Sequence, residues 1–299
     1  MDGLSILIPV YNEKGSIEST LDNISSVMES SSINFEIIVI NDGSTDGTTE
    51  LLNGRRDSAD VRVITHSVNK GYGASLKTGV KHSKYTSIAI TDADGTYPNH
   101  KIPELYHELG TYDMVIGARA FKSLPRKTKP AKWMILKLAN YIAKEDIPDI
   151  NSGLRLFRKN SFIPFLPIIP DGFSLTTTIT LGMLTGGFDV AFVPIEYYCR
   201  EGKSKIQPIR DTLRFLKLIL KIGLYIAPLK IFVPFGIFVF LLGMFWAVFS
   251  YLVLGRFADT STIVIIMTSL QIMLLALIAE LINHRTQNYY KKTVDSYSE

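Results

Sequence analysis

The sequence predicts an α/β domain with a mainly parallel sheet, followed by a membrane-associated C-terminal region. Two observations carry this prediction. Apolar runs rich in β-branched residues alternate with helix-compatible stretches over about the first 200 of the 299 residues. This alternation is typical of a parallel sheet covered by helices on both faces. Two long uncharged runs then occupy much of the last third of the chain, and runs of this kind form membrane-spanning helices.

The predicted strands and helices alternate in order along the N-terminal region. The predicted strands are residues 4–10, 35–40, 61–65, 87–91 and 114–116. The predicted helices are residues 15–28, 45–53, 74–81 and 101–109. Ligands of open α/β sheets bind at the carboxyl ends of the strands. The residues to inspect are therefore 9–13, 41–44, 92–94 and 117–119, while the Lys-, Arg- and Pro-rich segment 121–132 is expected to be a flexible loop.

Composition excludes several classes of protein. The chain has 32 Lys and Arg against 28 Asp and Glu, and its net charge of +4 is too balanced for a dedicated nucleic-acid-binding protein. Its single cysteine, Cys199, excludes an intramolecular disulfide framework and a cysteine-rich zinc module. Asp2 stands where a secretory signal needs basic residues, and Pro9 interrupts the short apolar run, so we expect no signal peptide.

The C-terminal region is predicted to form a transmembrane hairpin. Residues 231–254 are 24 positions without a charge, and a helix of that length reaches ~36 Å, enough to cross a hydrocarbon core of ~30 Å. Residues 262–279 form a second uncharged run of 18 residues, and the linker 255–261 is too short for a domain. The alternative is a buried hairpin in a soluble core, for which both runs are unusually long.

Basic residues predict the orientation of this hairpin. Seven Lys and Arg lie within 203–230 and three within 285–292, whereas the linker holds only Arg256. The positive-inside rule therefore places both ends in the cytoplasm. Residues 206–225 repeat apolar and basic residues at helical spacing, which predicts an amphipathic helix on an anionic membrane surface. The alternative is a packed helix with a solvated charged face.

The predicted domain boundaries follow from these patterns. They are 1–203 for the cytoplasmic α/β domain, 204–229 for the amphipathic juxtamembrane region, 230–284 for the two spans (about 231–254 and 262–282) and 285–299 for a cytoplasmic tail.

Acidic residues after two of the strands point to a site for a divalent cation. Asp92 and Asp94 flank Ala93 at the end of a predicted strand. Alternate residues of an extended chain face opposite ways, so a turn has to begin here if both carboxylates are to converge. Carboxylates, waters and substrate phosphates are the usual partners of a hard divalent cation. An isolated pair of this kind is more often a solvated turn, but Asp42 follows another strand and faces the same crevice. Glu13 either joins them or serves as an acid in the first turn of a helix.

Glycines and basic residues lie near the same predicted crevice. Residues 69–74, Asn-Lys-Gly-Tyr-Gly-Ala, match the spacing of neither common phosphate-binding loop, and we interpret them as a tight turn before a helix. Arg119 follows a strand, and Arg200 precedes Lys203. Basic side chains beside a carboxylate site suit a substrate that carries phosphates, although in isolation they are ordinary surface charges. The five histidines show no metal-ligand spacing and no evident role as a base.

These motifs together resemble the inverting family-2 glycosyltransferases. The run Ser-Ile-Leu-Ile-Pro-Val-Tyr-Asn-Glu at residues 5–13 is similar to the opening strand of that family. The further matching motifs are residues 40–48, 69–74, 91–95, 114–119 and 151–157. The last two narrow the resemblance to polyprenyl-phosphate glycosyltransferases, such as dolichyl-phosphate mannose synthase and the bactoprenyl-phosphate hexosyltransferases. It covers about residues 4–226, and the two-span hairpin is similar to the bacterial branch.

The resemblance implies a domain of the GT-A type, which binds a nucleotide-sugar, and it implies roles for individual residues. Asp92, Asp94 and Arg119 would be catalytic, and the metal would be held by Asp92, Asp94 and Thr96. Many relatives carry Gln at the position of Thr96 and use it on the metal, so coordination here would use a hydroxyl or a water. The donor would be bound by Pro9, Tyr11, Glu13, Ile40, Asp42, Asp92, Ala93, Asp94, Arg119, Arg200 and Lys203. The lipid phosphate would be contacted by Arg126, Lys132, Ser152 and Arg155.

The expected reaction transfers a hexose from a UDP- or GDP-hexose to undecaprenyl or dolichyl phosphate, with Mg²⁺ or Mn²⁺ as cofactor. A lipid phosphate has a second pKa of about 6 and is mostly a dianion at neutral pH, so a strong general base is unnecessary. The metal, Arg and Lys neutralise charge on the leaving nucleoside diphosphate, and one in-line displacement inverts the anomeric carbon. The expected partners are the donor, the lipid acceptor and the bilayer, with no nucleic acid.

Two alternative functions and one hypothesis about assembly stay open at this point. A processive polysaccharide synthase would carry a Gln-x-x-Arg-Trp motif, and Trp133 and Trp246 both lack that context. A catalytically decayed, membrane-anchored scaffold or flippase partner is the non-enzyme reading, for which Thr96 is the one hint. Gly236 and Gly243 allow close helix contact, which makes a homo-oligomer a further hypothesis.

Overall fold

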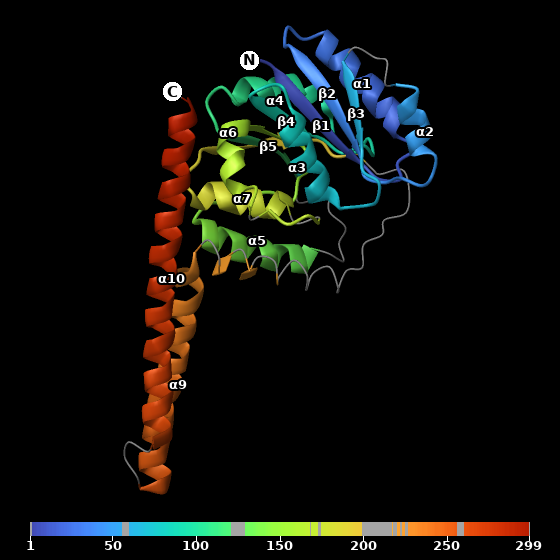
Figure 1. The fold of residues 1–299 in the computed structure, drawn as a ribbon. Coiled ribbons are helices and arrows are strands. Elements are labelled where there is room, and N and C mark those ends of the chain that lie inside the picture. The colour runs from blue at the N-terminus through green and yellow to red at the C-terminus, as the bar shows by residue number, and fades with distance from the viewer. Residues whose placement is uncertain are drawn as a thin grey trace. The chain divides into compact units, whose positions relative to one another are not determined.

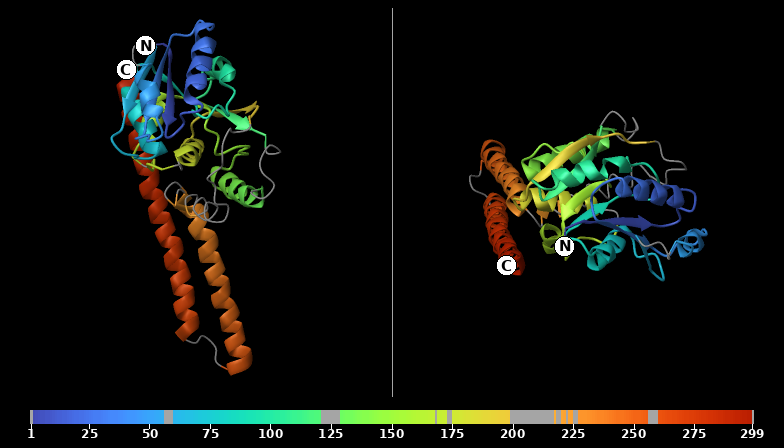
Figure 2. Two further views of the ribbon diagram at one scale, coloured as in Figure 1. Left: turned by 90° about the vertical axis from the view of Figure 1, so that its right-hand side faces the viewer. Right: turned by 90° about the horizontal axis from the view of Figure 1, so that it is seen from above.

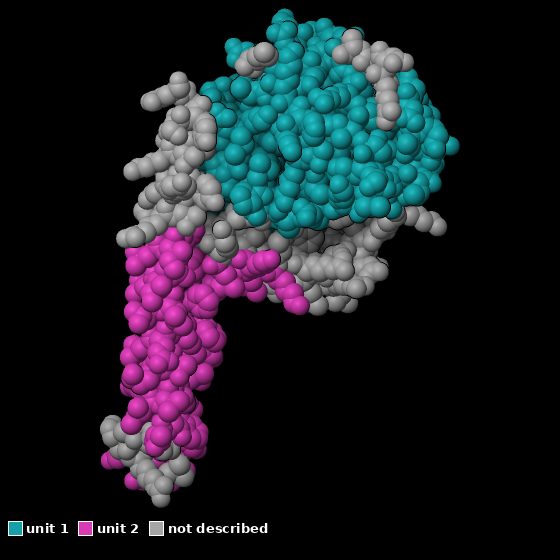
Figure 3. Space-filling view, in the orientation of Figure 1, with its two compact units in different colours: residues 1–216 teal, residues 217–299 magenta. Residues whose placement is uncertain are grey.

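The computed structural model describes residues 2–55, 60–120, 129–167, 169–172, 175–198, 217, 220–221, 223–224, 227–255 and 260–298. The chain divides into two compact units, Met1–Leu216 and Lys217–Glu299, which Figure 3 distinguishes by colour. Each unit is described by itself below.

The first unit is built on one sheet, shown in Figures 1 and 2. In the described part of the chain its seven strands lie in the order β3-β2-β1-β4-β6-β5-β7. Strands β3, β2, β1 and β4 are mutually parallel, β6 is antiparallel to both of its neighbours, and β5 is parallel to β7. The strand bounds are β1 Leu4–Val10, β2 Phe35–Asn41, β3 Val61–Thr65, β4 Ser87–Ile90, β5 Met114–Arg119, β6 Arg155–Arg158 and β7 Val190–Ile195.

The mainly parallel sheet that the sequence predicts is confirmed, with two strands added. The five predicted strands are present, and β5 runs three residues further than residues 114–116. Strand β6 is only four residues long, and β7 carries a proline within it, so neither gives a strong alternating pattern. Strand β6 pairs with both β4 and β5 and thereby places residues 155–157 of the 151–157 motif in the middle of the sheet.

Helices cover both faces of the sheet because alternate strand residues face opposite ways. Leu4, Ile6 and Ile8 pack with apolar residues of α1, α2 and α4, whereas Leu7 packs with those of α3, α6 and α7. The bounds of these helices are α1 Ile17–Glu29, α2 Thr48–Asn53, α3 Tyr72–His82, α4 Ile102–Glu108, α6 Lys159–Phe162 and α7 Leu175–Thr185. Two short 3-10 helices, η1 Asn99–Lys101 and η4 Ile163–Phe165, complete these layers.

Helix α5, Lys129–Ala143, packs against α7. The sequence predicts a flexible loop over residues 121–132. Residues 121–128 lie outside the described residues, but 129–132 form the first turn of α5, so the loop prediction is wrong there. Pro130 does not prevent this helix, because the first turn needs no intrahelical bond from its N–H groups.

The second unit is a hairpin of two long helices, α9 Pro228–Leu254 and α10 Thr260–Ser298. Both contain a segment long and apolar enough to cross a membrane, Pro228–Val253 and Thr260–Asn283, each with a mean hydropathy of 2.4. Only 11% and 17% of these segments' apolar windows are buried, which disfavours the soluble-core alternative. Helix α10 also continues through most of the predicted tail. Most of the predicted amphipathic region 204–229 lies outside the described residues.

Two glycines of α9 lie directly against α10 of the same chain. A Cβ on Gly236 would lie 2.8 Å from Met273 Cγ, and one on Gly243 would lie 3.0 Å from Ile266 Cγ1. The close helix contact that these glycines predict is therefore made within the hairpin, as small residues allow in membrane helices. These two glycines therefore do not support a homo-oligomer, which stays a prediction.

Candidate active site

The candidate site lies at the carboxyl edge of the sheet, next to β1. The chain runs outward from β1 to β2 and β3, then returns to the other side of β1 as β4. A reversal of strand order leaves a crevice beyond the carboxyl ends of the two strands, where ligands of α/β proteins bind. Tyr11, Asp42 and Asp92 follow three of these strands closely. The fold therefore brings the three predicted segments to one edge.

The segments after β1 and β2 are hydrogen-bonded to each other. The Asn12 N–H donates to Ser44 Oγ (3.0 Å), and the Thr45 N–H donates to Asn12 Oδ1 (2.8 Å). The Glu13 N–H donates to Thr48 Oγ1 (3.2 Å). Asn12 has a φ of 57°, a left-handed conformation that Asn tolerates better than most side chains. In this arrangement Tyr11 is 43% exposed at the edge of the site.

Asp42 is buried and holds the turn that precedes α3. Its Oδ1 accepts from the Lys70 N–H (2.9 Å), and its Oδ2 accepts from the Gly71 N–H (2.8 Å). Oδ1 also lies 2.7 Å from Nδ1 of His66, a buried residue directly after β3. The other ring nitrogen of His66 lies 3.0 Å from Thr78 Oγ1. The predicted donor contact of Asp42 stays a prediction, and the observed function of this carboxylate is to join β2, β3 and α3.

The sequence pattern assigns no role to His66, because none of the five histidines has metal-ligand spacing or an evident role as a base. The signal that was present is positional: His66 comes immediately after β3, at the same edge as the acidic residues.

The glycine-rich segment at residues 69–74 is a tight turn, as interpreted from the sequence. The N–H groups of Gly73 and Ala74 both donate to the Asp171 carbonyl, at 2.8 and 3.1 Å. The N-terminus of α3 is thus occupied by the protein itself. Gly71 has a φ of 100°, and a Cβ on Gly73 would collide with the Pro170 carbonyl oxygen. These glycines permit the close approach of residues 170–172.

Asp92 and Asp94 lie in a turn directly after β4, as their convergence requires. The phenol of Tyr72 donates to Asp92 Oδ1 (3.2 Å), and Asp92 lies so close to Gly153 that a Cβ there would be 2.6 Å from Oδ2. Asp94 Oδ1 accepts from both the N–H (3.2 Å) and the hydroxyl (2.6 Å) of Thr96. Burial and the nearby Asp92 charge raise the pKa of Tyr72, so this phenol stays a hydrogen-bond donor.

The carboxylates of Asp92 and Asp94 fit a hard divalent cation that is bound jointly by the protein and by a substrate phosphate. Across the described residues no group of three or more His, Cys, Asp or Glu gathers as a metal cage. Asp92 and Asp94 are both partly buried, and a pair of carboxylates that binds Mg²⁺ commonly shares it with waters and phosphate oxygens. Thr96 is fully buried and its hydroxyl donates to Asp94, which orients that carboxylate. Its assignment as a metal ligand stays a prediction.

Arg119, at the end of β5, is paired with Asp149. Arg119 Nε donates to Oδ2 (2.6 Å) and Nη2 to Oδ1 (3.0 Å), and both side chains are 12% exposed. Burial alone would lower the pKa of Arg119, but the hydrogen bonds and charge of Asp149 raise it. The guanidinium also lies 5.1 Å from the Tyr197 ring centroid. Asp149 has no sequence signal of its own, because it is 30 residues from Arg119.

Ser152 and Arg155, which the resemblance assigned to the lipid phosphate, are both fully buried. The Ser152 hydroxyl donates to the Gly117 carbonyl. Arg155 donates to the carbonyls of Ser152 and Thr176 and to the Thr180 hydroxyl, all neutral acceptors. Burial lowers the pKa of Arg155 to about 10, so it remains charged at neutral pH. Both side chains are thus held within the protein by backbone carbonyls and the Thr180 hydroxyl, and their contact with a lipid phosphate stays a prediction.

The remaining predicted residues are distributed as follows. Ile40 is fully buried beneath α3, and the carbonyl of the buried Ala93 accepts from the Thr20 hydroxyl (3.1 Å). Pro9 lies opposite Ile40 in the β1–β2 register. Lys132 lies in α5, while its side chain and the residues Arg126, Arg200 and Lys203 lie outside the described residues.

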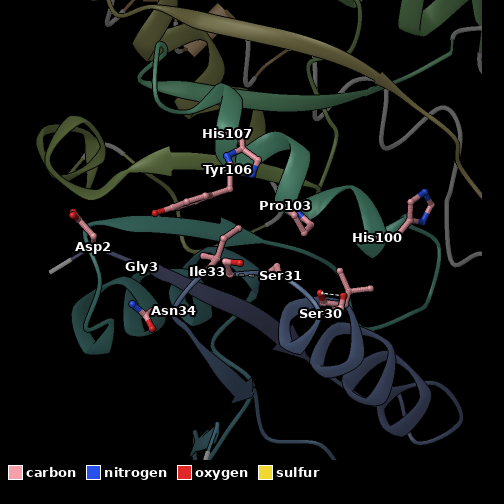
Figure 4. A pocket seen from close by; sticks show the side chains of 12 residues that line it. Asp2, Gly3, Ser30, Ser31, Ile33, Asn34, His100, Pro103, Tyr106 and His107 are labelled. Atoms are coloured by element: carbon pink, nitrogen blue, oxygen red, sulfur yellow. Dashed lines mark hydrogen bonds between the residues drawn. The ribbon is translucent and has the colours of Figure 1, made fainter.

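A pocket of about 690 Å³ lies elsewhere, at the opposite edge of the sheet (Figure 4). Gly3 and Asn34, which line it, precede β1 and β2 respectively. Its two histidines, His100 and His107, lie apart from each other in Figure 4. Asp92 and Asp94 are not among the residues that line this pocket.

Comparison with known proteins now identifies the family. Residues 5–165 match Glycosyl transferase family 2, and residues 227–284 match the GtrB C-terminal hairpin. The chain belongs to glycosyltransferase family 2, and it is a glycosyltransferase with a GT-A fold.

The chain is also similar in sequence to several named proteins. The chain is 32% identical to glycosyltransferase AglJ of Haloferax volcanii, over 70% of this chain and 68% of that protein. It is 28% identical to a dolichyl-phosphate hexose transferase of the same organism, over 75% of this chain and 95% of that protein. It is 32% identical to an undecaprenyl-phosphate 4-deoxy-4-formamido-L-arabinose transferase of Yersinia pestis, over 58% of this chain and 57% of that protein.

Solved structures confirm the fold. Glucosyl-3-phosphoglycerate synthase from Mycobacterium tuberculosis, in complex with Mn²⁺, uridine-diphosphate and phosphoglyceric acid, superposes with a TM-score of 0.59. The match covers 74% of this chain and 78% of that chain at 19% identity.

The packing around Gly73 predicts that alanine substitutions at two glycines differ in their effect on stability. Gly73→Ala is expected to lower the free energy of unfolding by about 1–3 kcal/mol, because the new Cβ displaces the 170–172 segment. Gly15→Ala is the control, since nothing lies within 4 Å of a Cβ there. Urea unfolding of the detergent-solubilised chain measures both, and equal effects would contradict the close approach.

The buried Arg119–Asp149 pair predicts a second difference. Asp149→Ala leaves the guanidinium without its counter-charge and is expected to destabilise the protein by about 3–5 kcal/mol. Asp22→Ala removes the exposed partner of Arg55 and should cost less than about 1 kcal/mol. The same unfolding measurement compares them, and a small loss for Asp149→Ala would show that the pair is solvated.

Proposed function

We propose that this protein transfers a hexose from a nucleoside-diphosphate sugar to a polyprenyl phosphate and yields a polyprenyl-phosphate monosaccharide. One observation carries the proposal: a family-2 domain, with Asp92 and Asp94 at the carboxyl edge of its sheet, is joined in one chain to a GtrB hairpin. Two relatives named as dolichyl-phosphate and undecaprenyl-phosphate sugar transferases support the class of acceptor. Undecaprenyl and dolichyl phosphates both fit this class.

The donor is proposed to bind across the carboxyl ends of β1, β2 and β4. The exposed ring of Tyr11 offers a face for a nucleobase, and the hydrogen bonds between Asn12, Ser44 and Thr45 hold it in place. The mycobacterial synthase with this fold is complexed with uridine-diphosphate, which supports a nucleoside diphosphate. Both UDP- and GDP-hexoses are proposed donors.

Asp92 and Asp94 are proposed to hold Mg²⁺ or Mn²⁺ together with the donor diphosphate. The Mn²⁺ in the mycobacterial synthase supports this assignment. A bound divalent ion supplies charge neutralisation for the departing nucleoside diphosphate. Thr96 orients Asp94, and Tyr72 with Gly153 positions Asp92. These contacts fix the carboxylates before substrate arrives, which limits the reorganisation that the reaction requires.

The acceptor phosphate is proposed to act as the nucleophile without a general base from the protein. Its second pKa of about 6 makes it mostly a dianion at neutral pH. The protein then has to orient two anions that repel each other. One in-line displacement at the anomeric carbon forms the new C–O bond as the bond to the nucleoside diphosphate breaks, and inverts the configuration.

The site is proposed to face the cytoplasm. The Lys and Arg residues that flank the hairpin on both sides, against one Arg in its linker, support this orientation through the positive-inside rule.

A donor screen tests the proposed reaction. Membranes that contain the protein are incubated with a polyprenyl phosphate and radiolabelled UDP-glucose, UDP-GlcNAc, UDP-galactose or GDP-mannose, each with Mg²⁺, Mn²⁺ or EDTA. We expect metal-dependent label in the organic phase with one donor. Folded protein that labels no lipid with any donor, yet binds a nucleotide-sugar in calorimetry, would instead support the decayed scaffold.

The carboxylate of Asp94 gives a sharper prediction. Asp94→Asn should lower kcat at least ~100-fold, the scale of losing one electrostatic stabiliser of a transition state. Asp2→Asn is the matched control, because Asp2 lines the pocket at the opposite edge. Circular dichroism checks that both variants fold. Unchanged turnover in folded Asp94→Asn would overturn the site assignment.

A further inference from the structure

His66 is a buried histidine directly after β3 that the proposed reaction does not use. Its ring lies between two elements of the candidate site. Nδ1 is 2.7 Å from Oδ1 of Asp42, which follows β2, and Nε2 is 3.0 Å from Oγ1 of Thr78, in α3. The His66 N–H also donates to the Asn41 carbonyl (2.9 Å). The backbone and both ring nitrogens of His66 therefore have partners, which fixes the orientation of the ring.

The hydrogen bonds around the ring define its protonation state. The Thr78 hydroxyl donates its proton to the Ala74 carbonyl (3.0 Å), a bond that helical threonines form with the residue four positions before them. Its oxygen then accepts from Nε2. The Asp42 carboxylate is likewise an acceptor, and a proton shared between a carboxylate and an imidazole resides on the more basic imidazole. Both ring nitrogens of His66 are therefore donors, which makes the ring an imidazolium.

The charge of the ring is matched by a carboxylate in the same buried place. The side chains of His66 and Asp42 are only 6% and 5% exposed. The Asp42 carboxylate also accepts from the N–H groups of Lys70 and Gly71. A buried carboxylate that loses its counter-charge takes up a proton or water instead, and either change weakens its hold on these two N–H groups.

The turn held by Asp42 leads directly to the proposed metal site. Gly71 caps the N-terminus of α3, and Tyr72 is the first residue of that helix. The Tyr72 phenol donates to Asp92 Oδ1 (3.2 Å). A shift of the turn therefore moves the phenol that orients Asp92.

We propose that His66 is a positioning residue of the candidate active site. Its imidazolium holds Asp42 and the turn before α3, and this turn keeps the Tyr72 phenol on Asp92. The consequence for metal binding rests on the proposed function of Asp92. The protonation state of the ring does not, so the two parts of the proposal are tested separately.

Nitrogen NMR of the full chain in nanodiscs, with isotope-labelled histidine rings, tests the protonation state. His66→Gln removes one of the five histidine signals and thereby assigns it. At neutral pH we expect both ring nitrogens of His66 to be protonated. Thr78→Val removes the acceptor of Nε2 and should convert the ring to a neutral tautomer, which identifies the same signal if His66→Gln does not fold. Thr78→Ser keeps the acceptor and should leave the spectrum unchanged. An unprotonated Nε2 in the unaltered chain would overturn the proposal, because the Thr78 hydroxyl would then be the donor.

The dependence of sugar transfer on Mg²⁺ tests the positioning role. His66→Gln is expected to raise the half-saturating Mg²⁺ concentration at least ~5-fold, the scale of losing one hydrogen bond to a charged group. Tyr72→Phe should raise it similarly. The double variant should add little to the larger single effect, because both changes act through the same contact with Asp92. His107→Gln, at an exposed histidine of the pocket at the opposite edge, is the matched control and should leave the Mg²⁺ dependence unchanged.

Two other outcomes overturn the positioning role. A lower rate at an unchanged half-saturating Mg²⁺ concentration would mean that His66 contributes to stability alone. Additive effects of His66→Gln and Tyr72→Phe would mean that the two residues act on the site independently. An unaltered chain that transfers no sugar would contradict the proposed function instead. The NMR result would still decide the protonation state, and Mn²⁺ binding to the same variants, measured by electron paramagnetic resonance, would then decide the positioning role.

Discussion

The buried carboxylate of Asp42 organises one side of the candidate site. A carboxylate that is buried away from water needs hydrogen bonds or a counter-charge for both of its oxygens. It finds them in two N–H groups of the turn before α3 and in the His66 ring. That requirement ties the ends of β2 and β3 to α3. The first N–H groups of α3, in turn, donate to the Asp171 carbonyl in the 170–172 segment. The position of Tyr72, and through it of Asp92, depends on this chain of contacts.

On the other side of the site, the sheet brings two largely buried arginines, Arg119 and Arg155, next to their hydrogen-bond acceptors. Arg119, the last residue of β5, forms an ion pair with Asp149. Arg155, the first residue of β6, donates only to neutral acceptors. Strand β6 places the second of these cations in the middle of the sheet. Arg119 is neutralised by Asp149, whereas Arg155 stays charged at neutral pH among neutral acceptors, so Arg155 adds positive potential to this side of the site.

The second unit obeys a different constraint, because no water is available to its backbone in a bilayer. Helices α9 and α10 satisfy their backbone groups internally, and glycines let them approach closely. Near the start of α9 the Leu229 N–H donates to Glu280 Oε2 (3.3 Å). An acidic group at a helix N-terminus is favoured by the helix dipole, and here it comes from the neighbouring helix because Ala227, at the cap position, has no capping side chain.

The sequence by itself determined the alternating elements, the apolar hairpin and the acidic residues at strand ends, because each depends on local periodicity or on a short motif. Asp92, Asp94 and Asp42 were found in this way. Tertiary structure alone decided the partners: His66 for Asp42, Asp149 for Arg119, and the burial of Ser152 and Arg155. It also decided that β6 runs antiparallel and that residues 129–132 begin a helix. These features join residues distant in sequence, and their energies depend on burial and on geometry that appear only once the chain has folded.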